Sequence, residues 1–170
     1  VITEISIVDA YLEKLFSFVD VKNIVPLKVV LDGGNGMAGV ILEKIFARLP
    51  VSFYPLFLEP DGNFPNHEAN PLKEETLSAL RQKVLEIGAD VGFAFDGDGD
   101  RIGLVDDLGE IVRGDMITAL LASIALGWNP EGTILYDLRQ SMIVAEEVVR
   151  HGGRAIMSRV GHGFIKPQMV

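Results

Sequence analysis

The sequence predicts an α/β fold made of two layered units, in each of which helices flank a mixed sheet. Three observations support this prediction. Short apolar runs rich in β-branched residues alternate with segments of helical periodicity. The order strand, loop, helix, strand occurs twice, and Asp32 and Asp137 close the matching strands at a plausible domain spacing. The length of 170 residues allows one large or two small domains, and the apolar content of 48% is enough for a core.

The first unit is expected to occupy residues 1–110. Apolar residues at three- and four-residue spacing predict an amphipathic helix over 7–19, and a β-branched run stopped by two glycines predicts a strand over 28–32. The same rules predict a helix at 40–49, a strand at 51–58, a Pro-, Gly- and Asn-rich loop at 59–71, a helix at 74–87, a strand at 90–95, and a hairpin of 101–105 with 110–112 that turns at 107–109.

The second unit is expected over residues 111–170, with the boundary near 107–114. Asp115 is expected to cap an apolar helix over 116–126, which Gly127 ends. The remaining expected elements are a strand at 133–138, a helix at 142–151 closed by two glycines, and a strand at 155–160.

Composition argues against several classes of partner. The chain has 15 Lys and Arg against 24 Asp and Glu, a net charge of −9, and no basic cluster, so nucleic acid is not expected. The absence of cysteine agrees with a reducing cytoplasm. The longest apolar stretch, 116–128, is too short to span a bilayer, so no membrane partner is expected. Because the chain begins at Val1 and not at methionine, we expect it to be a fragment. Because it carries no signal-peptide pattern, we expect the protein to be cytoplasmic.

Two glycine-containing loops are candidates for the chemistry. The first carries Gly34, Gly36 and Gly39 in a G-x-G-x-x-G pattern after a strand and before a helix, with Glu59 about 20 residues further along. This spacing is typical of dinucleotide sites, where glycines let backbone amides approach a pyrophosphate. The same glycines also suit a tight strand-to-helix turn, and we favour the turn because the pattern is degenerate.

The second loop places Asp96, Asp98 and Asp100 directly after an apolar strand, with single glycines between them and Arg101 behind them. Two unit charges about 4 Å apart repel by about 4 kcal/mol at an effective dielectric constant of about 20, so a solvated acidic turn is disfavoured. A divalent cation such as Mg²⁺ relieves this repulsion, and the glycines allow the loop to curl. We therefore expect the three carboxylates to converge at the C-terminal end of the strand.

Two other classes of carboxylate loop share part of this aspartate pattern. An EF-hand requires glycine at its sixth position and glutamate at its twelfth, where this chain has Arg101 and Asp107. A phosphatase of the haloacid-dehalogenase class also places an aspartate pair after an apolar strand, with the first aspartate as nucleophile. That rival keeps Asp96 as a candidate nucleophile.

Several separated motifs together resemble the α-D-phosphohexomutases, and specifically the bacterial phosphomannomutase/phosphoglucomutase group. They follow one another in the order Asp32-Gly-Gly-Asn-Gly36, Glu59-Pro-Asp-Gly-Asn-Phe-Pro-Asn-His67, Asp96-Gly-Asp-Gly-Asp-Arg101, Gly114-Asp115, Tyr136-Asp-Leu-Arg139 and Val160-Gly-His-Gly-Phe-Ile-Lys166. The related phosphoglucosamine mutases usually lack segments like 64–67 and 161–165, which favours the mannose/glucose branch.

The resemblance implies three-layer α/β/α units with mixed sheets, the phosphoglucomutase-like domains. Residues 1–110 would be the second domain and residues 111–170 the first part of the third. The implied reaction interconverts hexose 6-phosphate and hexose 1-phosphate through a phosphoserine and a bisphosphorylated intermediate. The phosphoserine loop, a sugar loop and the fourth domain are not in this sequence, so the fragment alone is expected to be inactive and to need the remaining domains of its polypeptide.

The resemblance also implies the site residues of the first unit. Asp96, Asp98 and Asp100 would hold Mg²⁺, and Arg101 would lie beside the transferred phosphate. A planar guanidinium can meet phosphate oxygens in a bidentate way, although local charge balance explains the same arginine.

In the second unit, the resemblance implies that Arg139, Gly161 and His162 face the sugar. Some family members have lysine in place of Arg139, and because arginine does not release its proton, we expect this residue to orient the sugar and stabilise charge. His162 could bond a hydroxyl or shuttle a proton, or be a turn histidine. His67 and His151 are expected to be structural.

Overall fold

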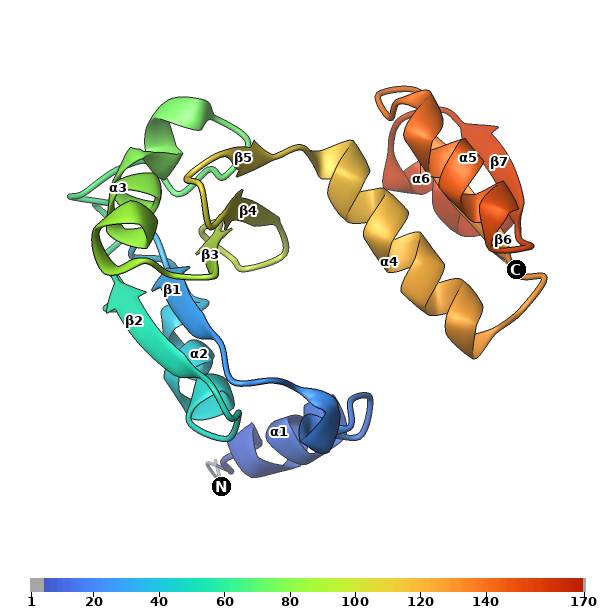
Figure 1. Cartoon of the computed structure of the whole chain (residues 1–170). Coiled ribbons are helices and arrows are strands. Elements are labelled where there is room, and N and C mark those ends of the chain that lie inside the picture. Colours follow the sequence, from blue (N-terminus) through green and yellow to red (C-terminus); the bar gives the residue numbers. More distant parts are fainter. Residues whose placement is uncertain (1–4, 170) are drawn as a thin grey trace, which may run out of the picture. The chain divides into compact units, whose positions relative to one another are not determined.

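A computed structural model describes residues 5–169 of the chain, which separates into two compact units, Val1–Ile111 and Val112–Val170 (Figure 1). Each unit is described by itself. No helix in the described part is long and apolar enough to cross a membrane.

The first unit is built around a five-stranded mixed sheet. The strands lie in the order β2-β1-β3-β4-β5, with β1 parallel to both β2 and β3 and with β4 antiparallel to β3. Along the chain the elements are α1 (Val8–Phe16), the 3₁₀ turn η1 (Val21–Asn23), β1 (Lys28–Asp32), α2 (Gly39–Phe46), β2 (Ser52–Leu56), the 3₁₀ turn η2 (Glu74–Leu77), α3 (Ser78–Ile87), β3 (Val91–Phe95), β4 (Ile102–Asp106) and β5 (Ile111–Val112).

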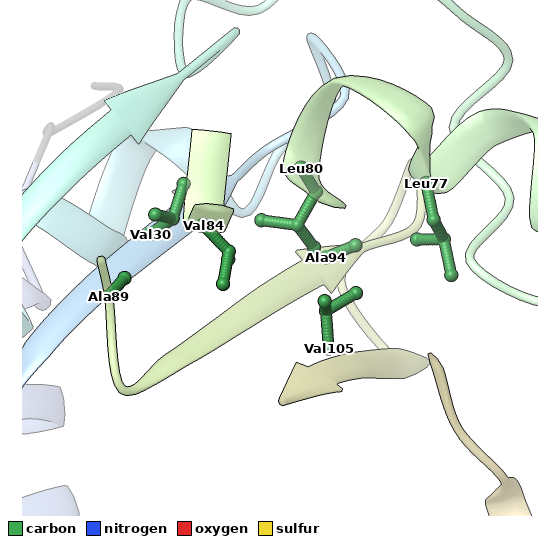
Figure 2. Packing of buried hydrophobic residues seen from close by; sticks show 7 residues of the cluster. All are labelled: Val30, Leu77, Leu80, Val84, Ala89, Ala94 and Val105. Atoms are coloured by element: carbon green, nitrogen blue, oxygen red, sulfur yellow. The ribbon is translucent and has the colours of Figure 1, made fainter. Parts of the chain in front are cut away.

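Alternation along the central strand β1 produces two cores, one on each face of the sheet. Val30 joins a cluster with α3, which Figure 2 shows together with Ala94 of β3 and Val105 of β4. Val29 and Leu31 point to the opposite face and pack with α2. Because successive side chains of a strand face opposite sides, one apolar strand can support both helix layers. The predicted three-layer α/β/α arrangement with a mixed sheet is confirmed in this unit.

The predicted helix over 7–19 is wrong at its C-terminal end, because α1 ends at Phe16. The Ser17 hydroxyl donates to the carbonyl of Lys14, and the Asp20 carboxylate accepts the amide of Lys22. Short polar side chains that bond to nearby backbone groups compete with helix continuation, which explains the early end.

The second unit contains two parallel strands covered by helices. Its elements are α4 (Gly114–Trp128), β6 (Thr133–Asp137), α5 (Met142–Arg150), β7 (Arg154–Ser158), α6 (His162–Ile165) and the 3₁₀ turn η3 (Lys166–Gln168). Two small clusters form its core, one around Tyr136 and Val144 and the other around Leu126 and Val148.

Two details of the α4 prediction are wrong. Asp115 lies inside the first turn instead of at the cap, where its carboxylate accepts the amide of Met116. Gly127 does not end the helix, which continues to Trp128. The chain leaves the helix at Asn129, because a residue before proline is disfavoured in helical conformation.

Candidate metal centre and neighbouring loops

The acidic loop follows β3 at the C-terminal end of the strand. Asp96, Asp98 and Asp100 each offer a carboxylate oxygen, and these atoms lie within 4.8 Å of one another. Asp96 is fully buried, whereas the other two carboxylates are exposed. Gly99 adopts a φ of 75°, which an L side chain rarely takes, so the curl of the loop depends on this glycine. The convergence predicted from the sequence is confirmed.

Asp96 is held by the arginine that closes the loop. One carboxylate oxygen accepts the backbone amide of Arg101 at 3.0 Å, and the other accepts its Nε at 2.6 Å. Burial raises the pKa of Asp96, but the amide and the guanidinium of Arg101 outweigh burial and hold the pKa below its ordinary value. Asp96 is therefore a charged carboxylate, and both of its oxygens accept hydrogen bonds from Arg101.

Asp100 has the opposite electrostatic character. Repulsion from Asp98, followed by partial desolvation and the charge of Asp96, raises its pKa. A cluster in which Asp98 and Asp96 repel Asp100, and which offers only oxygen donors, fits a hard divalent cation such as Mg²⁺.

The glycines of the first loop meet the protein's own backbone. A Cβ on Gly36 would lie 2.8 Å from the carbonyl oxygen of Gly97, and one on Gly39 would lie 1.8 Å from that of Leu58. In addition, the amide of Met37 donates to the carbonyl of Gly97 at 2.9 Å. The G-x-G-x-x-G spacing is thus explained by close packing of this turn against two other loops, one of them the acidic loop.

Beside these loops lies an aspartate–histidine pair that the sequence did not predict. Asp32, at the end of β1, is fully buried, and its Oδ2 lies 3.0 Å from Nε2 of His67. Burial raises the pKa of Asp32, and the neighbouring His67 partly offsets this rise. His67 was expected to be structural, and the sequence offers no signal that links it to an aspartate in another loop.

In the second unit Arg139 follows β6 and bonds to the aspartate at the end of that strand. Its Nη2 lies 2.7 Å from Asp137, whose carboxylate also accepts the Arg139 amide at 2.9 Å. This side-chain bond outweighs desolvation and lowers the pKa of Asp137. The side chain of Arg139 is 70% exposed, so it is accessible to a ligand.

Gly161 and His162 follow the neighbouring strand β7. Gly161 has a φ of 117°, and His162 begins the short helix α6 with its side chain exposed. Since β6 and β7 are parallel neighbours, Arg139 and the Gly161-His162 pair both lie beyond the C-terminal edge of one sheet. This edge is where open α/β sheets bind ligands.

Comparison with known families decides the relationship. Residues 9–109 match the family described as phosphoglucomutase/phosphomannomutase, alpha/beta/alpha domain II, and residues 113–170 match alpha/beta/alpha domain III of the same family. The chain belongs to the phosphoglucomutase/phosphomannomutase family. This places it among the α-D-phosphohexomutases, as the motifs predicted.

Individual phosphohexomutases match nearly all of the chain. It is 44% identical over 168 residues to a phosphomannomutase/phosphoglucomutase of Pseudomonas putida, an alignment that covers 99% of this chain and 36% of that protein. A phosphomannomutase of Escherichia coli is 43% identical over 171 residues, with 98% of this chain and 38% of that protein covered. The chain therefore spans little more than a third of the length of these relatives.

Solved structures agree with the fold. A phosphoglucomutase/phosphomannomutase family protein of Burkholderia thailandensis superposes with a TM-score of 0.88 at 36% identity, covering 98% of this chain and 36% of that one. A protein structure from Thermus thermophilus, at 19% identity and a TM-score of 0.81, supports the fold alone.

Proposed function

We propose that this chain is part of a phosphohexomutase that interconverts hexose 6-phosphate and hexose 1-phosphate, and that it supplies the Mg²⁺-binding loop. The mannose and glucose phosphates are the proposed substrates. The observation that carries the proposal is the convergence of Asp96, Asp98 and Asp100 at the end of β3, in a chain of this family. We further propose that residues 1–110 are the second domain and residues 111–170 the first part of the third.

The proposed mechanism assigns positioning and charge balance to the first unit. Asp96, Asp98 and Asp100 would hold Mg²⁺, which would neutralise charge on the transferred phosphoryl group. In the proposed reaction, this group is transferred by way of a phosphoserine and a bisphosphorylated sugar. Arg101 bonds to Asp96 through its backbone amide and Nε. Its terminal nitrogens have no hydrogen bond within residues 5–169, so they can meet phosphate oxygens in a bidentate way. The phosphoserine belongs to another part of the same polypeptide.

The second unit is proposed to contact the sugar. Arg139 is already charge-balanced by Asp137, so it can orient a hydroxyl or phosphate without giving up a proton. His162 is exposed at the start of α6, and its imidazole can bond a sugar hydroxyl or move a proton at a ring nitrogen. Gly161, with a φ of 117°, comes directly before His162 and is proposed to present its backbone to the sugar.

The rival phosphatase mechanism requires Asp96 to be a free nucleophile. The carboxylate is fully buried, and each of its oxygens accepts a hydrogen bond from Arg101. A nucleophilic carboxylate has to reach a phosphorus atom with an unhindered lone pair. These contacts favour a ligand role for Asp96 over a nucleophilic one.

The proposal is tested by assaying the natural polypeptide that carries this chain. We expect it to interconvert mannose 6-phosphate and mannose 1-phosphate, and we expect the 170-residue chain alone to be inactive. Asp98→Ala should lower turnover by orders of magnitude and leave sugar-phosphate binding less affected, because the loop acts on the transferred group. Asp107→Ala removes an exposed charge from a hairpin of the same unit and is the matched control.

Two further measurements separate the alternatives. His162→Ala should weaken sugar handling and leave metal affinity unchanged. A free-phosphate assay on the chain and on the natural polypeptide tests the rival. Phosphate release by the 170-residue chain that disappears in Asp96→Asn would contradict the mutase assignment.

A further inference from the structure

The buried pair of Asp32 and His67 joins two loops that are far apart in sequence. Oδ1 of Asp32 accepts the amide of Gly34 at 2.9 Å, which fixes the turn after β1. Nε2 of His67 lies 3.2 Å from Oδ1 and 3.0 Å from Oδ2 of the same carboxylate. The imidazole thus ties the loop after β2 to the end of the central strand.

Both ring nitrogens of His67 face oxygen atoms. Nδ1 lies 2.9 Å from the carbonyl oxygen of Glu68, and a carbonyl can only accept, so Nδ1 donates. Nε2 faces both oxygens of the Asp32 carboxyl group. The ring also packs edge-on against Phe57 at a centroid distance of 5.4 Å. Burial and these contacts fix the imidazole in one orientation.

A second tie runs parallel to the first. The side chain of Asn35 donates to the carbonyl of Glu59 at 2.8 Å and accepts from Asn66 at 2.8 Å. Asn35 and Phe57 both adopt positive φ angles, 57° and 51°, which non-glycine residues rarely take. Such conformations persist only where surrounding contacts hold them, and here those contacts come from the loop that contains His67.

The turn that is held in this way is the surface on which the acidic loop rests. The amide of Met37 donates to the carbonyl of Gly97, and Gly36 leaves no space for a side chain against the same carbonyl. Gly99 also lies against this turn, because a Cβ at this position would lie 3.4 Å from the Cβ of Ala38. A shift of the turn after β1 therefore moves the backbone between Asp96 and Asp100.

From this chain of contacts we infer that His67 is a positioning residue for the carboxylates of the acidic loop, acting through Asp32 and the turn of residues 33–38. The inference rests on the proposed function, since it assumes that the acidic loop binds a divalent cation. His67 does not touch the loop. It sets the position of the backbone against which the loop packs, in the way that outer contacts of metal sites orient the ligands.

A matched control lies at the other end of the same strand. There the carboxylate of Asp90 accepts the amide of Lys28 at 2.7 Å, a long-range tie on β1 that is remote from the acidic loop. Loss of this bond should cost stability and leave the acidic loop unchanged. The comparison therefore separates a positioning role from a general contribution to folding.

The first measurement is the Mn²⁺ affinity of the natural polypeptide that carries this chain, with electron paramagnetic resonance as the method of detection. His67→Leu, which removes both ring nitrogens, should weaken Mn²⁺ binding about tenfold or more, the loss typical of outer contacts of metal sites. His67→Gln, whose amide can still donate to Asp32, should recover most of the affinity. Asn66→Ala removes one of the two bonds of the second tie and should weaken binding less than His67→Leu. Asp90→Ala should stay close to the unaltered protein.

The second measurement is hydrogen exchange without metal, reported for the peptide that contains residues 96–101. His67→Leu and Asn66→Ala should speed exchange there, whereas Asp90→Ala should not. The inference is overturned if Mn²⁺ affinity and exchange of the loop are unchanged in both His67→Leu and Asn66→Ala. If His67→Leu does not fold, the same two measurements on Asn66→Ala and His67→Gln test the inference. If the unaltered protein and Asp98→Ala bind Mn²⁺ equally, the metal loop itself is wrong and the inference fails with it.

Discussion

Asp32 and Asp137 occupy matching places at the ends of β1 and β6, and each carboxylate accepts the backbone amide two residues further along, at 2.9 Å in both cases. Their partners differ. Asp32 is fully buried and paired with His67, which lies 35 residues away, whereas Asp137 is paired with its close neighbour Arg139. The aspartate that ends the strand therefore connects two loops in the first unit. In the second unit it bonds only within the turn that follows the strand.

The difference shows how one local motif acquires two roles. A partner from the same turn leaves the arginine side chain largely exposed, so it remains available to a ligand. The partner from a distant loop, His67, is only 15% exposed and holds its loop against the end of β1. Accordingly, pairing lowers the pKa of Asp137, while burial raises that of Asp32.

The largest expected effect is on the free energy of unfolding, which should depend much more on the Asp32–His67 pair than on the Asp137–Arg139 pair. His67→Leu leaves a buried carboxylate without its partner and should destabilise the first unit by about 3–5 kcal/mol. Arg139→Ala should have a much smaller effect, because Arg139 is mostly exposed. Hydrogen exchange of the β1 and β6 peptides at increasing urea concentration measures both. Equal losses in the two variants would contradict the comparison.

A second prediction concerns the glycines of the two units and has effects of opposite sign. Gly39→Ala forces a Cβ to within 1.8 Å of the Leu58 carbonyl oxygen and should cost about 3 kcal/mol, since backbone on both sides cannot move aside easily. Gly127→Ala lies in open space within α4 and should stabilise the second unit by about 0.5–1 kcal/mol through helix propensity. Urea unfolding followed by circular dichroism measures both changes.

The smallest expected effect is a difference in pH dependence. The folded pKa of Asp137 is lowered, so its contribution to stability is present above the unfolded pKa of about 3.8 and is lost as the pH falls through the folded value. The folded pKa of Asp32 is raised, so its own contribution is present below the unfolded value and is lost as the pH rises through the folded one. Exchange of the β1 and β6 peptides between pH 6 and pH 3 should change in opposite directions in Asp32→Asn and Asp137→Asn relative to the unaltered chain.

Features that depend on neighbouring residues could be predicted from the sequence. The strand β3 follows from its apolar pattern, and the convergence of the three aspartates follows from the glycines that let the loop curl. The two-layer helix cover follows from the alternation of strands and helices. The roles of Arg101, Arg139, Gly161 and His162, Mg²⁺ as the metal, and location in the cytoplasm stay predictions.

Features that depend on tertiary contact could not be predicted. Nothing in the residues around His67 shows that its ring meets Asp32, because the contact requires the loops after β1 and β2 to be placed side by side. The glycine spacing of residues 34–39 had two explanations until the carbonyls of Leu58 and Gly97 were located. The end of α1 depended on local side-chain bonds that periodicity does not register.

The central strand β1 also carries a consequence for biosynthesis. One of its edges forms hydrogen bonds only with β3. The amide of Lys28 at this edge is bonded to Asp90, which lies 62 residues later in the chain. At a synthesis rate of about 5–20 residues per second, several seconds pass before that edge can be paired. During this interval the strand is an open template for other chains, whereas the β6–β7 pair of the second unit closes over a shorter separation. Translation speed across the first unit should therefore affect the yield of folded protein more than translation speed across the second.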